Sequence, residues 1–292
     1  MLTIVLALAA AVGYGSSDFA AGLAARGASV IRITILAEAV SVAVLLVVVP
    51  WVSSQPPSLS SVTWSVVGGL SGVIGAMALY VGFRHAAFSV AAPLSAVASA
   101  GFSVLAGLAF GEHPTALSLA GIVLALPAIV AVSVSSAGHA TAAAPAAAAS
   151  TGRHGAGVLW GLIAGAGFGV LFIGLNRAGS GHDLWPLVLA QAAALIAVAG
   201  FGAVRGHLRL PPRRASWLAA VTGVTGAAGT LCFFIATHRG LLAVTAVITS
   251  LYPASTILLA RLVLGERLTL IRIAGLGLAA ASVALIAAGG AG

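Results

Sequence analysis

The chain has 292 residues, of which 61% are hydrophobic and only 6% are charged. Soluble globular proteins carry about 25% charged residues, so this chain has too few to cover a water-exposed surface. Its net charge of +8 comes from 13 arginines that stand singly between apolar runs, which argues against a nucleic-acid partner. The composition instead predicts an all-α membrane protein whose outer surface faces lipid.

Ten apolar runs are long enough to cross a bilayer as helices, which takes about 20 residues each. In chain order they cover residues 2–22, 30–50, 62–82, 88–110, 116–136, 155–176, 184–204, 215–237, 241–264 and 270–289. All five tryptophans lie near the ends of these ranges, where an interfacial aromatic belt is expected. The first range is interpreted as a membrane helix and not as a cleaved signal, because no basic segment precedes it.

One connection is longer than the others and divides the chain. Residues 137–154 form a low-complexity linker of Ala, Thr, Ser and Pro that cannot bury a core. Residues 1–136 and 155–292 are therefore predicted to be two repeats of five helices. Because five is odd, the second repeat must enter the membrane from the opposite side. Such inverted repeats are characteristic of secondary transporters, which bind substrate at the repeat interface.

The two halves align without a gap at an offset of 154 residues. Gly69-Leu-Ser-Gly72 then lies over Gly223-Val-Thr-Gly226, and the Gly-Glu pair at 111–112 over the one at 265–266. A stripe of small residues also recurs, with Ala7, Ala11 and Gly15 over Gly161, Gly165 and Gly169. Small residues at every fourth position let helices approach closely in lipid, so the first and sixth helices are predicted to pack through these stripes.

The ninth range ends in a stretch with a recognisable pattern. Residues 250–269 combine a mid-helix proline, Pro253, with a helix end at Gly265-Glu266. Tyr14-Gly-Ser-Ser-Asp18-Phe in the first range adds an aromatic residue, a glycine and a small polar cluster. In both stretches the sequence resembles the drug/metabolite transporter superfamily and its EamA-type ten-helix members. The resemblance implies a secondary carrier of small metabolites or drugs, often an exporter.

Arginine is unevenly distributed between the two sides that the ten ranges define. Arg177 and Arg239 lie on one side, and Arg261 lies inside the ninth range. The other side holds ten: Arg26, Arg32, Arg84, Arg153, Arg205, Arg209, Arg213, Arg214, Arg267 and Arg272. Arginine excess marks the cytoplasmic side, so both chain ends are predicted to lie outside. The resemblance implies both ends in the cytoplasm, and we follow the charge distribution.

Asp18 and Glu38 are the two acidic residues well inside predicted spans. An ionisable group there is costly and normally faces a cavity or a partner. Their depths from the arginine-rich side agree, at roughly 8 and 12 Å for a rise of ~1.5 Å per residue. Consecutive helices are usually neighbours, so both acids are expected to line one cavity. They are candidates for carrying a proton or a cationic substrate group; the alternative is structural pairing with Arg26 or Arg32.

Further candidates are less distinctive. Tyr80, Asn176 and Gln191 are polar groups in or near spans, where interhelical hydrogen bonding is the plain alternative. Proline interrupts a helix and is tolerated at membrane depth where it lines a cavity, which singles out Pro93, Pro253 and the neighbouring Tyr252. The first half has Ser99 where the family proline would stand, and Pro93 is a candidate replacement.

The two acidic helix ends have two readings. Glu112 and Glu266 follow the helix-ending residues Gly111 and Gly265. They are candidates for a gate or a coupling site. The alternative is a polar helix end that turns into water and pairs with Arg267 or His113.

The favoured function is secondary active transport, as an exporter, of a small organic metabolite or drug across the cytoplasmic membrane. The alternative is a non-transporting scaffold or a carrier of lipid head groups. Gly-Leu-Ser-Gly around Ser71 matches a motif of intramembrane serine proteases, but no histidine is predicted at membrane depth to serve as its base. No enzymatic activity, cofactor or metal site is predicted, and Cys232 stands alone. Partners are the solute, lipid and a proton.

Overall fold

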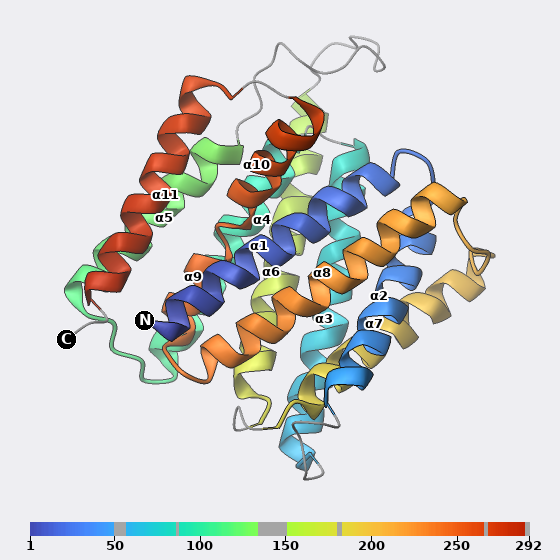
Figure 1. Ribbon diagram of the computed structural model, residues 1–292, viewed down its shortest axis with the longest axis horizontal. Coiled ribbons are helices and arrows are strands. Elements are labelled where there is room, and N and C mark those ends of the chain that lie inside the picture. The colour runs from blue at the N-terminus through green and yellow to red at the C-terminus, as the bar shows by residue number, and fades with distance from the viewer. Residues whose placement is uncertain (50–56, 86–87, 134–150, 180–182, 266–267, 290–292) are drawn as a thin grey trace.

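The computed structural model describes residues 1–49, 57–85, 88–133, 151–179, 183–265 and 268–289, and these ranges are almost entirely helical (Figure 1). The helices are α1 (Leu2–Ala24), α2 (Val30–Val48), α3 (Leu59–His85), α4 (Phe88–Ala109), α5 (Ala116–Ser133), α6 (Thr151–Arg177), α7 (Trp185–Val204), α8 (Arg213–Thr237), α9 (Leu242–Thr249), α10 (Tyr252–Leu264) and α11 (Leu270–Gly289).

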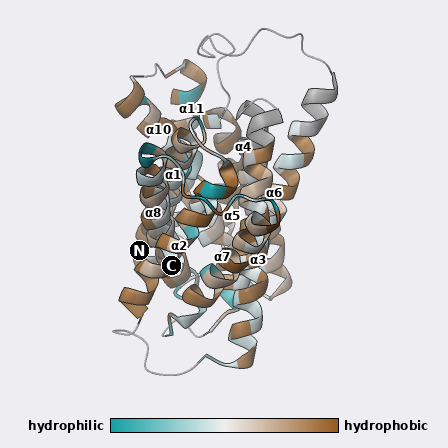
Figure 2. Ribbon diagram, turned by 90° about the vertical axis from the view of Figure 1, so that its right-hand side faces the viewer, coloured by the Kyte–Doolittle hydropathy of each residue, from teal (hydrophilic) through white to brown (hydrophobic). Residues whose placement is uncertain are grey.

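Within the described ranges, nine segments are long and apolar enough to cross a membrane, with α9 and α10 together forming one of them. The 22-residue α4 supplies a tenth crossing. Apolar residues dominate the helices, as the brown colour in Figure 2 shows. The predicted ten-helix membrane fold is confirmed.

Most helix ends differ from the predicted ranges by a few residues, and two differences matter for the fold. The sixth helix begins at Thr151, four residues before the predicted start at residue 155. The ninth range is divided, because α9 ends at Thr249 and α10 begins at Tyr252. Pro253 has no backbone N–H to donate to the carbonyl one turn earlier, so the continuous ladder stops there. The expected interruption by this proline is therefore present.

The most extensive packing joins α1 to α8 and α6 to α3. A Cβ atom at Gly13 would lie 2.7 Å from the Cα atom of Gly229, and one at Gly167 would lie 2.8 Å from that of Gly75. These two contacts are copies of each other, because each half supplies the same two positions at the 154-residue offset. Each of the two crossings therefore pairs one helix of the first half with one helix of the second half.

The remaining helix pairs follow the same symmetry. Just as α2 packs on α8, α7 packs on α3, and the pairs α5–α11 and α2–α7 each join equivalent helices of the two halves. α1 runs antiparallel to α8, and α6, which starts from the opposite face, runs antiparallel to α3. The ten crossings therefore form two inverted five-helix repeats.

The small-residue stripes are contact surfaces, as predicted, but they do not meet each other. A Cβ atom at Gly15 would overlap Ser255 and the carbonyl of Tyr252 in α10, and one at Gly165 would overlap Ala98 and Ser95 in α4. The stripe of α1 thus packs on α9–α10, and the stripe of α6 packs on α4.

The Gly-Leu-Ser-Gly motif takes part in the same close packing. The carbonyl oxygen of Ser71 would lie 2.6 Å from a Cβ atom at Gly167, and that of Thr225, its equivalent, 2.9 Å from one at Gly13. A motif that repeats with the same neighbours in both halves is accounted for by helix packing.

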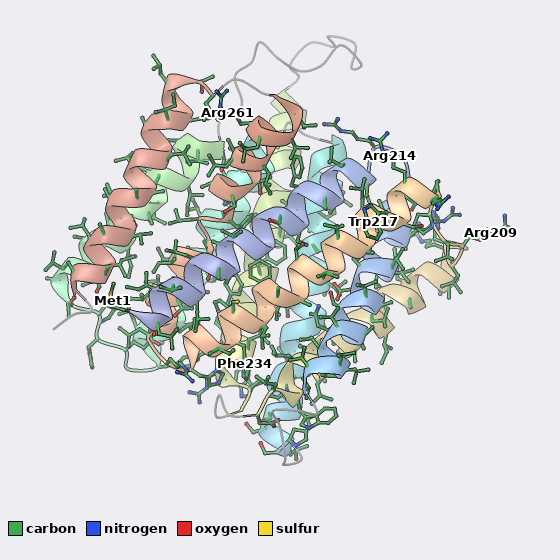
Figure 3. All side chains as sticks on the ribbon, in the orientation of Figure 1. Met1, Arg209, Arg214, Trp217, Phe234 and Arg261 are labelled. Atoms are coloured by element: carbon green, nitrogen blue, oxygen red, sulfur yellow. The ribbon has the colours of Figure 1, made fainter. Side chains whose placement is uncertain are left out.

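The bundle has two ends, which we name by their residues. The start of α1 and the end of α11 lie at one end of the bundle, together with the helix ends at residues 109, 116, 177, 185, 237 and 242; this end is the terminal face. The helix ends at residues 24, 30, 204, 213, 264 and 270 lie at the other end, the arginine face. Arg261 occupies the last turn of α10 and is exposed, so it belongs to the arginine face and is not buried in the span. Figure 3 shows Arg209, Arg214 and Arg261 far from Met1.

Adding a methyl group at either glycine crossing should destabilise the protein. We expect Gly13→Ala and Gly167→Ala each to cost about 1–3 kcal/mol, because the new Cβ atom would meet backbone that cannot move aside. Thermal unfolding of the purified protein in one detergent measures this effect. Gly22→Ala is the matched control in α1, because a Cβ atom there would meet nothing within 4 Å. Equal stability of all three variants would contradict the crosswise contacts.

The arginine distribution also predicts which face of the bundle lies in the cytoplasm. In a Cys232→Ser background, Leu210→Cys on the arginine face should resist an impermeant thiol reagent on intact cells and react after permeabilisation. Leu210 is 76% exposed, so the site itself is not shielded. Arg239→Cys on the terminal face should react on intact cells. The reverse pattern would place both termini in the cytoplasm.

Candidate functional site

The two membrane-embedded acids lie on helices that α8 holds apart. The expectation that α1 and α2 are direct neighbours is wrong, because each packs on α8, which lies between them (Figure 1). The Ser17 hydroxyl donates to the Thr222 carbonyl at 3.1 Å, and the Ser41 hydroxyl donates to the Gly223 carbonyl at 2.8 Å. Two adjacent residues of α8 thus fasten α1 and α2 on different sides of that helix.

Asp18 and Glu38 nevertheless belong to one polar cluster. The Tyr14 hydroxyl lies within electrostatic range of both carboxyl groups, and it donates a hydrogen bond of 3.1 Å to Thr230 on α8. Among the described residues, neither acid forms an ion pair with Arg26 or Arg32. One carboxyl oxygen of Glu38, Oε2, is buried and has no hydrogen-bond partner. The alternative of structural pairing therefore gains no support here.

The helix break at Ser250–Leu251 brings a second tyrosine to this cluster. Tyr252 begins α10, is 6% exposed and lies within electrostatic range of Asp18 and close to Ser95 of α4. The Tyr252 and Ser95 hydroxyl oxygens are both buried without a hydrogen-bond partner. A buried hydroxyl without a partner costs free energy, which indicates that these groups serve something other than stability. Pro253, as predicted, lies at the irregular backbone beside them.

The cluster is chemically asymmetric although the fold is symmetric. At the 154-residue offset, Phe172 is the equivalent of Asp18, and it stacks on Phe233 with ring centroids 4.4 Å apart. Ala98 likewise corresponds to Tyr252. The acids and both tyrosines therefore occur only in the copies formed by α1, α2 and α10.

Glu38 has an equivalent of its own in the second half. Ala37 would touch a Cβ atom at Gly223, and Ala190 would touch one at Gly69, so α2 and α7 pack alike with an offset one residue shorter. Leu-Ala-Glu-Ala around Glu38 then corresponds to Leu-Ala-Gln-Ala around Gln191. Gln191 is half-buried, and within the described ranges its side chain makes no hydrogen bond.

Two other predicted polar residues lie away from this cluster. Asn176 donates to the carbonyl and the hydroxyl of Thr237, at 3.3 and 2.9 Å, near the terminal face. This bond joins α6 to α8, as the plain alternative of interhelical hydrogen bonding expects. Tyr80 lies in α3, and its side chain is outside the described part of the chain. Pro93 is buried inside the uninterrupted α4.

The first acidic helix end has a partner in the other half. Gly111 adopts a φ of 87°, which turns the chain out of α4. The carboxylate of Glu112 then accepts hydrogen bonds from the backbone N–H groups of Leu242 and Ala243, the second at 2.9 Å. A carboxylate satisfies the unpaired N–H groups of a helix N-terminus and its positive dipole end, here that of α9. Gly265 has a φ of 69°, and Glu266 lies outside the described residues.

Two more contacts join the halves at the terminal face. The Arg177 guanidinium lies 4.8 Å from the centroid of the Phe110 ring, which connects the ends of α6 and α4. The Thr3 hydroxyl donates to the Arg239 carbonyl at 3.1 Å. Together with Glu112, they fasten the two repeats to each other at this end.

With this geometry, the family assignment rests on the second repeat. Residues 155–288 match the EamA-like transporter family. The chain carries an EamA domain. One solved structure, described only as the crystal structure of a protein, covers 96% of this chain and 98% of its own length, with 18% identity and a TM-score of 0.72. At that identity the likeness shows the fold alone, over both repeats. No curated protein matches the sequence.

The EamA match confirms the resemblance drawn from the residues around Pro253 and the Gly-Glu helix end. It does not single out the serines and threonines that complete the cluster. Ser95 and Thr230 are short polar residues in apolar helices, where many such residues only bond to their own helix backbone. Ser95 lies two residues after Pro93, and that position alone does not mark it as a site residue.

Removing the Glu112 carboxylate should loosen the terminal face of this protein. Hydrogen bonds to a charged group contribute about 1.5–3 kcal/mol each, so Glu112→Ala should separate the α4 and α9 ends. Spin labels at the exposed residues His113 and Arg239 report this separation as a longer or broader distance distribution. Asp183→Ala is the matched control, because Asp183 accepts from Trp185 at the start of its own helix. An unchanged distribution in Glu112→Ala would contradict a gating role.

Proposed function

We propose that this EamA-family membrane protein is a secondary active transporter that exports a small organic solute across the cytoplasmic membrane. The carrying observation is the polar cluster of Tyr14, Asp18, Glu38 and Tyr252 within the spans, in which Glu38 Oε2 and the Tyr252 hydroxyl are buried without a hydrogen-bond partner. Ionisable groups at membrane depth are costly and are normally kept for function.

The interior between the repeats favours this function over a scaffold. A scaffold would fill the interface with leucine and phenylalanine, whereas fully buried hydroxyl residues recur here. α4 contributes Ser95, Ser99 and Ser103, and α9 together with the residue after it contributes Thr245, Thr249 and Ser250. Ser99 and Ser250 share a hydrogen bond of 3.2 Å between the halves. A carrier of lipid head groups is the remaining alternative.

The contacts support one access state. The terminal face is held shut by Glu112, Arg177 and Thr3, which each bond to the other half. We assign this conformation to access from the arginine face, which the arginine distribution places in the cytoplasm. Rocking of the two inverted repeats would open the other side.

Proton coupling is assigned to Asp18 and Glu38. Each can be charged when its side is open to water and neutral when it is enclosed, so that a proton is carried with each cycle. Tyr14 on α1 is the titratable group near both acids, and Tyr252 on α10 lies near Asp18; Cys232 on α8 lies near Tyr14. The described part of the chain places no basic side chain among them.

Metabolites released by cells that express the protein, compared with a deletion strain, test transport directly. Wild-type release should rise as the external pH falls, because protons entering the cell drive the exchange. Glu38→Gln and Asp18→Asn should each lower release by about tenfold or more and remove its pH dependence, since a neutral amide cannot exchange a proton. Asp183→Asn, an acid on the terminal face outside the cluster, should behave as wild type.

Three outcomes distinguish proton coupling from a structural role of the acids and a transporter from a scaffold. Full pH-dependent release by both variants at normal protein levels would show that the coupling assignment is wrong. Failure of both variants to accumulate in the membrane would favour a structural role for the acids. Identical metabolite profiles with and without the wild-type protein would favour the scaffold.

A further inference from the structure

A hollow opens on the outside of the bundle where α2 packs on α8, at the arginine face. It has a volume of about 560 Å³. Its walls come from α2, from the connection before α8 and from α8 itself: Leu36, Leu210, Arg213, Ser216, Trp217 and Ala220. The four α8 residues are spaced at i, i+3, i+4 and i+7 and so form one face of that helix. Ala215 and Ala219 are buried on its opposite side, so the lining face is turned toward the bilayer.

The hollow is polar where α8 begins and apolar farther into the span. Arg213 is the first residue of α8, and Ala220 lies seven residues on, or ~10 Å deeper at a rise of ~1.5 Å per residue. Leu36 adds a second apolar wall from α2. Trp217 lies between these levels and is 72% exposed, as expected of an aromatic ring at the membrane interface. A cation, an aromatic ring and an apolar groove thus follow one another in the order of head group, interface and acyl chain in a phospholipid.

The polar end of the hollow carries concentrated positive charge. The ten residues from 205 to 214 include no acid and four arginines: Arg205, Arg209, Arg213 and Arg214. Figure 3 shows Arg209, Arg214 and Trp217 at the same end of the bundle. Arg213 and Arg214 also occupy the first turn of α8, where the helix dipole is positive and cations are unfavourable. An anion at this place would offset both the mutual repulsion of the arginines and the dipole.

The described part of the chain supplies no such anion. Its four acids lie at the terminal face or inside spans: Glu112, Asp183, Asp18 and Glu38. Glu38 is on α2, two residues beyond Leu36, but it does not line the hollow. Within the described ranges Arg213 therefore has no acidic partner, and the compensating charge must come from outside the protein.

The walls of the hollow are fixed by hydrogen bonds within the protein. The Ser216 hydroxyl donates to the Pro211 carbonyl at 2.8 Å, which holds the connection against the first turn of α8. The bond from Ser41 to the Gly223 carbonyl joins α2 to the same helix farther along. A site that is already formed loses less conformational entropy when a ligand binds.

We propose that this hollow binds one anionic phospholipid of the leaflet at the arginine face, with its phosphate at Arg213 and the upper part of an acyl chain along Ala220 and Leu36. A guanidinium group donates paired N–H bonds to phosphate oxygens. A lipid with a net negative head group is favoured over a zwitterionic one, because the neighbouring arginines attract the former and repel the cationic part of the latter. The proposal is independent of the transport function, because this lipid stays on the outside of the bundle.

Three probes separate an anionic lipid from other phosphates. They are dioleoyl phosphatidylglycerol, dioleoyl phosphatidylcholine with the same chains, and glycerophosphoglycerol, which is the water-soluble head group of the first. Each is titrated into the full-length, delipidated protein in one detergent, and native mass spectrometry measures the affinity of the first bound molecule. Phosphatidylglycerol should bind about tenfold more tightly than phosphatidylcholine. Glycerophosphoglycerol should not bind over the same concentrations, because it lacks the chains that fill the apolar part.

Two variants test the two ends of the hollow. Arg213→Gln should weaken phosphatidylglycerol binding by about fivefold or more, because it removes the charge that holds the phosphate. Ala220→Phe should weaken binding of both lipids, because its ring occupies the apolar part of the hollow. Arg239→Gln, at an exposed arginine of the terminal face, is the matched control and should bind as wild type. The melting temperature without lipid should be unchanged in both arginine variants, because these side chains are exposed.

Several results would overturn the proposal. Equal affinity for the two lipids, or unchanged phosphatidylglycerol affinity in Arg213→Gln, would refute a site for an anionic head group. Binding of glycerophosphoglycerol as tight as that of the lipid would show a site for soluble phosphates instead. Unchanged affinity in Ala220→Phe would place the lipid elsewhere, and equal losses in Arg213→Gln and Arg239→Gln would show attraction by net charge without a defined site.

Discussion

Close backbone contact between helices of opposite halves is the constraint on which the rest of this structure depends. In lipid there is no hydrophobic force to press one apolar helix on another, so association depends on van der Waals contact and interhelical hydrogen bonds. The glycines at 13 and 229, and at 167 and 75, bring backbones together where any side chain would separate them. Each of these contacts joins a helix of one repeat to a helix of the other repeat. The helices involved therefore make their closest backbone contact across the two repeats. In the proposed transport cycle, a movement that changes access would therefore pivot about these crossings and would not pull them apart.

The crossings also decide where the polar groups meet. α8 touches α1 through Gly229 and α2 through Gly223, and so keeps α1 and α2 from closing on each other. Asp18 lies one residue beyond Ser17, which bonds to α8, and Glu38 lies one residue beyond Ala37, which touches it. Both acids are thereby turned past the α8 contact and toward the interior. The same arrangement around α3 presents Phe172 and Gln191, so that a symmetric frame holds unlike chemistry on its two sides.

Much of the fold could be predicted from the sequence because its signals are local or repetitive. Apolar runs of about 20 residues give the helices, and the repeated Gly-Glu pairs and glycines give the two halves. The neighbours of each helix could not be predicted in this way. The expectation that α1 and α2 are adjacent was wrong because helix order in space is set by which small-residue faces fit together, and α8 offers two such faces. Asp18 and Glu38 stood out as acids in apolar runs, whereas Ser95 did not, since its missing partner is a property of three-dimensional packing alone.

The hydrogen bonds of Glu112 link the terminal face to Tyr252 in the polar cluster through the short helix α9. α9 is eight residues long, and its first N–H groups are held by a carboxylate of the other repeat, while its far end leads through Ser250 directly to Tyr252. A short helix with both ends fixed transmits displacement, because its intrahelical hydrogen bonds resist bending and its two flanking breaks do not. In the proposed cycle, opening the terminal face would require the α9 end to leave Glu112, and that displacement would reach the Tyr252 hydroxyl within the same crossing. Under the proposed transport mechanism, the Glu112 bond at the terminal face and the Tyr252 hydroxyl would thus be parts of one mechanical unit, which is the coupling that alternating access requires.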